Sequence, residues 1–139
     1  MADKFKLQVI APEHIVFEGE VNEVYAPGFH GEFGVRPGHA PYLVALKIGR
    51  LKVRADAKWT YAALSNGFAE VDYDSMRILA EACELSSDID RERATRARAR
   101  AEESLKKLDR QKEAERFAAA EAALKRALNR LSVSEKSEG

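Results

Sequence analysis

The residues that interrupt regular structure are confined to one part of this chain. All four prolines lie before residue 42, and seven of the eight glycines lie at or before Gly67. Ten of the eleven aromatic residues lie at or before Tyr73, and from Ser86 to Glu138 there is no glycine or proline at all. Chain rich in turn-forming and aromatic residues is typical of β structure, whereas breaker-free Ala/Arg/Glu/Lys/Leu chain is typical of helix. The sequence therefore predicts an α+β protein, with a β domain over residues 1–86 and a helical domain over residues 87–139.

Charge divides at the same place. Residues 1–85 hold 9 basic and 12 acidic residues, and residues 86–139 hold 14 basic and 11 acidic residues. The first domain is therefore acidic by three charges and the second basic by three, although the formal net charge of the chain is zero. This division supports two electrostatically different modules joined near residue 86.

The first domain reads as an antiparallel β-sandwich or flattened barrel. Alternation of apolar and polar residues is visible over 5–9 and 51–55, and it indicates strands with one buried face. Asn66-Gly67 lies between two strand-like runs and predicts a two-residue hairpin turn. Short separations favour up-and-down connections. The predicted strands cover residues 5–11, 14–17, 21–26, 42–47, 51–55, 59–65, 68–73 and 76–82.

The second domain predicts amphipathic helix, with Ser87 or Asp88 as its N-cap. Two apolar stripes repeat at three- and four-residue steps; they are Ala94, Ala97, Ala101, Leu105 and Leu108, and Phe117, Ala120, Leu124, Leu128 and Leu131. The pattern alone does not choose between one long helix and a two-helix hairpin. Residues 108–111 are the best candidate break, and a segment stable either way is a possible conformational switch.

Several classes of protein are disfavoured by the residues that carry chemistry. The balanced charge argues against a dedicated nucleic-acid-binding protein. The single Cys83 excludes an internal disulfide and multi-cysteine metal sites, and it reads as a small buried hydrophobe. His14, His30 and His39 have no partners at metal-ligand spacing, and no nucleophile elbow or Walker loop occurs. The chain has no run of about 18 apolar residues and begins without an apolar signal core, so we expect neither membrane insertion nor export.

Two features have both a plain and a functional interpretation. The glycines at 28, 31 and 34 read most simply as a turn-rich loop that needs positive φ. Five arginines lie between Arg91 and Arg100, and Arg126 and Arg130 follow on the second helical segment. Their plain interpretation is a solvated charged face, and from spacing alone it is the favoured one. Their functional interpretation is a phosphate site, because guanidinium groups match phosphate oxygens two at a time.

Three blocks of sequence resemble one family. Glycines at 28, 31 and 34 are followed by Pro37-Gly38-His39-Ala40-Pro41, and residues 64–71 read Leu-Ser-Asn-Gly-Phe-Ala-Glu-Val. Near the end, residues 123–133 read Ala-Leu-Lys-Arg-Ala-Leu-Asn-Arg-Leu-Ser-Val. In order and spacing these blocks resemble the epsilon subunit of bacterial F-type ATP synthase. Asn66 is a small departure, because the family usually has glycine at that turn.

The resemblance implies an N-terminal β-sandwich, a C-terminal two-helix domain and a non-catalytic rotor subunit of the central stalk. It implies attachment to the gamma subunit and to the c-ring, with Glu32 and His39 in the c-ring contact. It also implies that the C-terminal helices extend along gamma, meet acidic segments of the alpha and beta subunits, and block ATP hydrolysis. The expected location is peripheral, on the cytoplasmic face of the cell membrane, without membrane insertion or nucleic acid.

The resemblance further implies a regulatory nucleotide. Residues 89–94 fit the [I/L]-D-x-x-R-A motif of epsilon subunits that bind ATP, and other residues match that family's accessory contacts. ATP would join the two helices and favour the compact hairpin; whether magnesium accompanies it is left open. The implied ATP-binding residues are Glu84, Ile89, Asp90, Arg93, Ala94, Arg100, Arg126 and Arg130.

Three alternatives stay open at this point. A structural coupling subunit would never bind nucleotide, and Arg93→Ala would then change nothing. A helical nucleic-acid-binding arm would show salt-sensitive binding to DNA or RNA. A small hydrolase would turn over ATP by itself, which we do not expect.

Overall fold

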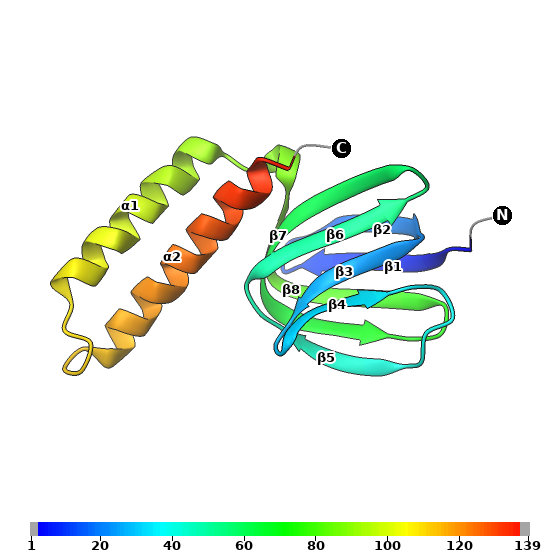
Figure 1. Cartoon of the computed structure of the whole chain (residues 1–139), viewed down its shortest axis with the longest axis horizontal. Helices are drawn as coiled ribbons and strands as arrows, with labels where there is room; N and C mark the ends of the chain where they lie inside the picture. The colour runs from blue at the N-terminus through cyan, green and yellow to red at the C-terminus, as the bar shows by residue number, and fades with distance from the viewer. Residues whose placement is uncertain (1–2, 137–139) are drawn as a thin grey trace.

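The computed structural model describes residues 3–136 and contains eight strands, one 3-10 turn and two helices (Figure 1). The predicted α+β fold is confirmed: a β-sandwich is followed by a helical hairpin. The end of the predicted second domain, residues 137–139, lies outside the described residues. The strands are β1 (Phe5–Ala11), β2 (His14–Val21), β3 (Glu23–Gly28), β4 (Gly31–Val35), β5 (Tyr42–Leu46), β6 (Gly49–Ala55), β7 (Lys58–Val71) and β8 (Ser75–Leu85).

The sheet folds over one apolar core. Its strand order is β2-β1-β8-β7-β5-β3-β4, and β6 pairs with β3 and β7. Alternation sets the core, since Phe5, Leu7 and Val9 of β1 are all buried while the residues between them are more exposed. Residues that alternate along a strand point to opposite faces, so the apolar set closes inward. The eighteen-residue core also includes Val24, Leu64 and Ile78.

The predicted hairpin at Asn66-Gly67 is wrong. The chain passes through these residues as one strand, β7, with φ of 54° at Asn66 and 142° at Gly67. On one side β7 pairs with β6 up to Leu64 and with β5 from Gly67 onward, while β8 runs along its other side. The positive φ values therefore produce an irregularity within a strand, where β7 changes partners, rather than a reversal.

Two other expectations for the sandwich are also corrected. The glycine segment contains a strand, β4, and only Gly31 of the three glycines at 28, 31 and 34 has a positive φ. Gly34 has a different role: a side chain there would collide with the Tyr25 ring. The connections are not purely up-and-down, because β1 pairs in parallel with β8 as well as antiparallel with β2. This parallel pair arises because the first and last strands of the domain lie side by side.

The helical domain is a hairpin. A 3-10 turn, η1 (Ser86–Asp88), precedes α1 (Arg91–Lys107), and α2 (Ala114–Ser134) follows a break that includes the predicted residues 108–111. The predicted caps were wrong: Asp90 is the N-cap of α1, and its carboxylate accepts a hydrogen bond from the Arg93 backbone N–H at 3.1 Å. Ser87 and Asp88 lie in η1, which leaves Asp90 at the position where the helix begins.

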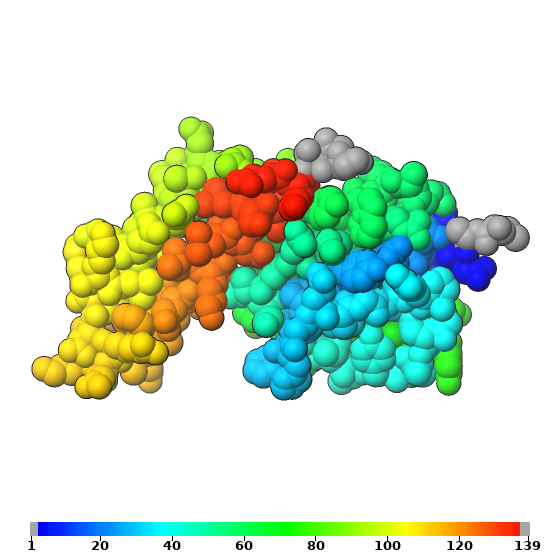
Figure 2. All heavy atoms as spheres, in the orientation of Figure 1, coloured from blue at the N-terminus to red at the C-terminus, as the bar shows by residue number. Residues whose placement is uncertain are grey.

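Small side chains form the contact between the helices. Ala94 and Ala101 of α1 and Ala120 and Ala127 of α2 are buried, which confirms the alanine stripe but not all of the second stripe. Leu128 is 42% exposed. The reason is that α2 has two neighbours, α1 and the β6–β7 end of the sandwich, so its buried residues do not form a single stripe. Figure 2 shows that the hairpin meets the sandwich over the C-terminal part of α2, while its tip projects away.

Candidate functional site

The eight residues implied for ATP binding come from three elements that meet near the domain boundary. Glu84 is the penultimate residue of β8, Ile89 and Asp90 precede α1, and the others lie on the two helices. Because α1 and α2 run antiparallel, the start of α1 lies beside the end of α2, as the hydrogen bond of 2.6 Å from Arg91 to the Ser134 hydroxyl also indicates. The fold thus brings the start of α1 beside the end of α2, and among the eight residues it places Glu84 and Arg130 in contact.

Glu84 and Arg130 are in direct contact. The Arg130 Nε donates to Glu84 Oε1 at 2.6 Å, and its Nη2 lies 3.4 Å from Oε2. Their side chains are 38% and 22% exposed, respectively. This charge-assisted pair joins α2 to β8, and it uses two groups that the resemblance assigns to nucleotide.

Three residues of the motif at the start of α1 have structural roles. Asp90 is the N-cap, Ala94 is fully buried against α2, and Ile89 is buried with Ala63 and Val133. Sequence spacing alone did not reveal these roles, because each depends on what the helices pack against. They are compatible with nucleotide binding but do not require it.

The other three arginines are exposed. Arg93 and Arg100 are seven residues apart, and helix geometry places them on the same side of α1 as Ser104 and Lys107. Arg126 and Arg130 share a side of α2 with Ala119 by the same rule. Ser104, Lys107 and Ala119 line one groove of about 500 Å³ between the helices, and none of these four arginines is among its lining residues. None of Arg93, Arg100 and Arg126 takes part in an ion pair within residues 3–136.

A larger hollow lies on the outer face of the sheet formed by β2, β1, β8, β7 and β5. Its volume is about 900 Å³, and Glu18, Glu20, Glu70 and Asp72 outnumber Lys6 and Arg77 along it. Exposed apolar side chains continue the same face: Leu43 is 68% exposed, Phe68 56% and Leu79 51%. Phe68 pairs with Leu79 across β7 and β8. This surface was not among the predicted sites; the signal in the sequence was the apolar residues at outward positions of the strands, such as Leu43, Phe68 and Leu79.

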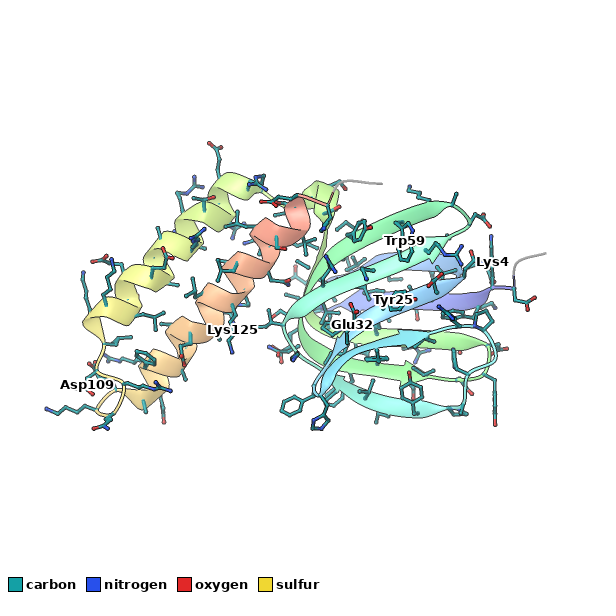
Figure 3. The ribbon with its side chains drawn as sticks, in the orientation of Figure 1. Lys4, Tyr25, Glu32, Trp59, Asp109 and Lys125 are labelled. Carbon is teal, nitrogen blue, oxygen red and sulfur yellow. The ribbon has the colours of Figure 1, made fainter. Side chains whose placement is uncertain are left out.

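Glu32 and His39 lie at different ends of β4. Glu32 is next to the turn that joins β3 and β4, on the side of the sandwich toward the helices, and its carboxylate is 3.9 Å from Lys52 Nζ (Figure 3). His39 follows the other end of β4 and packs edge-on against Phe5 with ring centroids 5.4 Å apart. Neither buried ring nitrogen has a hydrogen-bond partner within the described chain. The structure therefore does not bring the two predicted c-ring residues together.

The single cysteine is not available as a nucleophile. Cys83 is buried, and burial together with the nearby Glu84 charge raises the pKa of its thiol to about 12, which confirms it as an inert core residue. Residues 3–136 contain no cluster of His, Cys, Asp and Glu that could hold a metal ion. Neither helix over that range has the length and apolar character needed to cross a bilayer.

Comparison with known proteins accounts for both domains. Residues 4–86 match the model of the ATP synthase delta/epsilon chain β-sandwich domain, and residues 87–135 match that of its long α-helix domain.

The chain belongs to the ATP synthase delta/epsilon chain family.

Curated relatives align with this chain over nearly their whole length. The chain is 47% identical to the ATP synthase epsilon chain of Geotalea daltonii, over 99% of this chain and 98% of the relative. It is 44% identical to the epsilon chain of Nitratidesulfovibrio vulgaris, over 96% and 97%. Family membership confirms the resemblance and the expected non-catalytic role.

The fold also recurs in a solved structure. A chain in the Euglena gracilis mitochondrial ATP synthase structure, described as OSCP/F1/c-ring in rotational state 1, aligns with a TM-score of 0.76 and 24% identity, over 88% of this chain and 76% of that chain. At this level of identity the similarity supports the delta/epsilon fold.

Proposed function

We propose that this delta/epsilon family chain is the epsilon subunit of the central stalk of an F-type ATP synthase, where it couples gamma to the c-ring. The observation that carries the proposal is the agreement of both domains, in order, with relatives named epsilon chain at 47% identity over 99% of the chain. The subunit would be peripheral, on the cytoplasmic face of the cell membrane.

The outer face of β5, β7 and β8 suits the gamma contact. It combines the exposed Leu43, Phe68 and Leu79 with the acidic hollow beside them. An exposed apolar patch bordered by charged residues is typical of a protein interface. We propose that gamma covers it with an apolar surface that carries basic residues.

The tip of the β3–β4 hairpin suits the c-ring contact. Phe29 is 64% exposed there, its ring lies edge-on to His30, and Glu32 is the second residue of the following strand. Polar loops of the c-ring would meet Glu32 and the two rings. His39, at the far end of β4, would require a separate contact.

The helical domain would regulate hydrolysis by changing shape. Its contact surface is mostly alanine, and alanine burial stabilises far less than leucine burial. A weakly held hairpin with an excess of three basic charges can leave the sandwich, extend along gamma and meet acidic segments of alpha and beta. ATP, bound between the arginines of the two helices, would favour the compact form.

A second candidate is a coupling subunit that never binds nucleotide. It is favoured by the structural roles already held by Asp90, Ala94 and the Glu84–Arg130 pair. Calorimetric titration of the chain with ATP, beside Arg93→Ala, separates the two candidates. One-site binding that the substitution abolishes supports the sensor; no binding by either chain supports the coupling subunit.

Inhibition is tested in the assembled complex. Removal of residues 87–139 should leave assembly and coupling intact and raise the rate of ATP hydrolysis. Unchanged hydrolysis in the truncated complex would contradict the regulatory role, whereas loss of assembly would contradict the assignment of the stalk contacts to the sandwich.

A further inference from the structure

Two consecutive residues of α2 attach the helical hairpin to the sandwich. The side-chain amide of Asn129 donates to the Gly49 carbonyl at 2.9 Å and also lies 3.5 Å from the Leu64 carbonyl. Gly49 and Leu64 are partners at the end of the β6–β7 ladder. Asn129 thus satisfies backbone acceptors at the point where strand pairing stops.

Arg130, the next residue, makes the second contact. Its pair with Glu84 reaches β8 on the other side of β7 from β6. Both side chains are partly buried, and a charge-assisted hydrogen bond of 2.6 Å in such a position is stronger than one on an open surface. Together the two residues of α2 bind three neighbouring strands.

The apolar contact at the same boundary is small. Its buried members are Ala63, Ile89 and Val133, with Tyr61 packed beside them. Two aliphatic side chains and one alanine supply little apolar burial compared with the eighteen residues of the sandwich core. The polar contacts therefore decide how firmly the hairpin is held.

We infer that Asn129, Arg130 and Glu84 form a clasp that holds the hairpin compact in the absence of nucleotide. The inference rests on the proposed switch between compact and extended forms and adds a lock that does not depend on ATP. It also assigns Glu84 a different role from the one implied by resemblance: its carboxylate binds Arg130, not the ligand. ATP then adds to the clasp by joining Arg93, Arg100 and Arg126.

The clasp is tested on the full chain without nucleotide. Spin labels at Lys58→Cys and Lys112→Cys, in a Cys83→Ala background, report the distance from the sandwich to the hairpin tip. Both lysines are exposed. We expect one compact distance in this background. Asn129→Ala and Glu84→Gln should each raise the ratio of open to compact molecules about tenfold.

Matched variants separate the clasp from general destabilisation. Glu81→Gln, an exposed change on β8, and Lys125→Gln, an exposed change on α2, should leave the distance unchanged. The effects of Glu84→Gln and Arg130→Gln on hairpin opening should not add in the double variant, because both changes act on the same contact. Thermal unfolding of the β domain should be the same in all of them.

Three results would overturn the inference. The first is a compact distance that appears in the parent chain only after ATP is added. The second is an unchanged distance in both Asn129→Ala and Glu84→Gln. The third is additive effects of Glu84→Gln and Arg130→Gln.

ATP titration of the same variants tests the nucleotide proposal separately from the clasp. If Glu84 serves the clasp alone, Glu84→Gln weakens ATP binding by no more than the measured fraction of open molecules accounts for, because ATP binds the compact form. A greater loss of binding would return Glu84 to the ligand and overturn its role in the clasp. A parent chain that binds no ATP refutes the sensor alone, since the distances are measured without nucleotide.

Discussion

At the scale of single residues, the Glu23 carboxylate is held by two neighbouring side chains. It accepts hydrogen bonds from the Tyr25 hydroxyl and from Arg54 Nε, both at 2.6 Å, and its side chain is only 13% exposed. The Tyr25 hydrogen bond, and next the Arg54 hydrogen bond, lower the pKa of Glu23 from its ordinary value of 4.5. Trp59 stacks on the Tyr25 ring on the same face (Figure 3). The role of Glu23 is structural, because the Tyr25 and Arg54 side chains occupy both of its carboxylate oxygens.

This lowered pKa gives stability that depends on pH. A carboxyl whose pKa is lower in the folded chain stabilises it above the unfolded pKa and loses that effect as pH falls through the folded pKa. Glu23→Gln should therefore lower the free energy of unfolding by about 1 kcal/mol at neutral pH. The difference from the parent chain should vanish in acid, below the ordinary value of 4.5. Urea unfolding at several pH values measures it.

A matched change tests the cause. Glu13 is exposed in the turn between β1 and β2, so Glu13→Gln should have little effect at any pH. A constant Glu23→Gln effect from neutral to acid pH would contradict the assigned role of the ionised carboxylate.

At the scale of elements, the middle of β7 depends on one glycine. Gly67 has a φ of 142°, and a Cβ there would lie 2.0 Å from the Leu79 carbonyl oxygen. The backbone angle is one that residues with a Cβ rarely adopt. There is also no room for a Cβ, because the nearest atoms belong to the backbone of β8.

Gly67→Ala should consequently destabilise the sandwich by about 3 kcal/mol or more. Gly31→Ala is the matched control: Gly31 has a φ of 133°, but a Cβ there would meet nothing within 4 Å. Its cost should be limited to backbone strain, about 1 kcal/mol. Chemical denaturation of both variants measures the difference, and equal losses would show that close packing at Gly67 contributes nothing.

The start of α1 depends on the Asp90 carboxylate. Asp90→Ala removes the N-cap and should cost about 1 kcal/mol, with faster amide hydrogen exchange over the first turn of α1. Asp90→Asn keeps a capping oxygen and should exchange nearly as slowly as the parent chain.

The same pair informs the nucleotide proposal. If Asp90 acts only as a cap, ATP binding should follow helix integrity and survive in Asp90→Asn. Loss of ATP binding in Asp90→Asn, with the helix intact, would instead place the charge in contact with the ligand.

At the scale of the whole molecule, the two domains differ in how they are stabilised. The sandwich has an eighteen-residue apolar core of its own. The hairpin contains two helices of 17 and 21 residues that bury chiefly alanines between them. In proteins most of a helix's stability comes from tertiary packing of its apolar face rather than from helix propensity.

We therefore expect residues 1–86 alone to fold, with a cooperative thermal transition close to that of the full chain. Residues 87–139 alone should be only partly helical, with a broad transition. Circular dichroism of the two fragments measures this. A cooperative hairpin fragment would show that the clasp is not needed for its fold, and an unfolded sandwich fragment would contradict the independence of the β core.

The sequence by itself determined the two domains, their order, the core alternation, the position of the helix break and the family. These properties follow from composition, hydrophobic periodicity and local motifs. Each of these involves residues close together in the sequence, so it can be recognised without the structure. Tertiary structure decided the rest. It turned Asn66-Gly67 from a hairpin into an irregularity where β7 changes partners, and it separated Glu32 from His39 by the length of β4. It also paired Glu84 with Arg130 across 46 residues. Which neighbour a residue meets depends on the packing of distant strands and helices, and no local pattern contains that information.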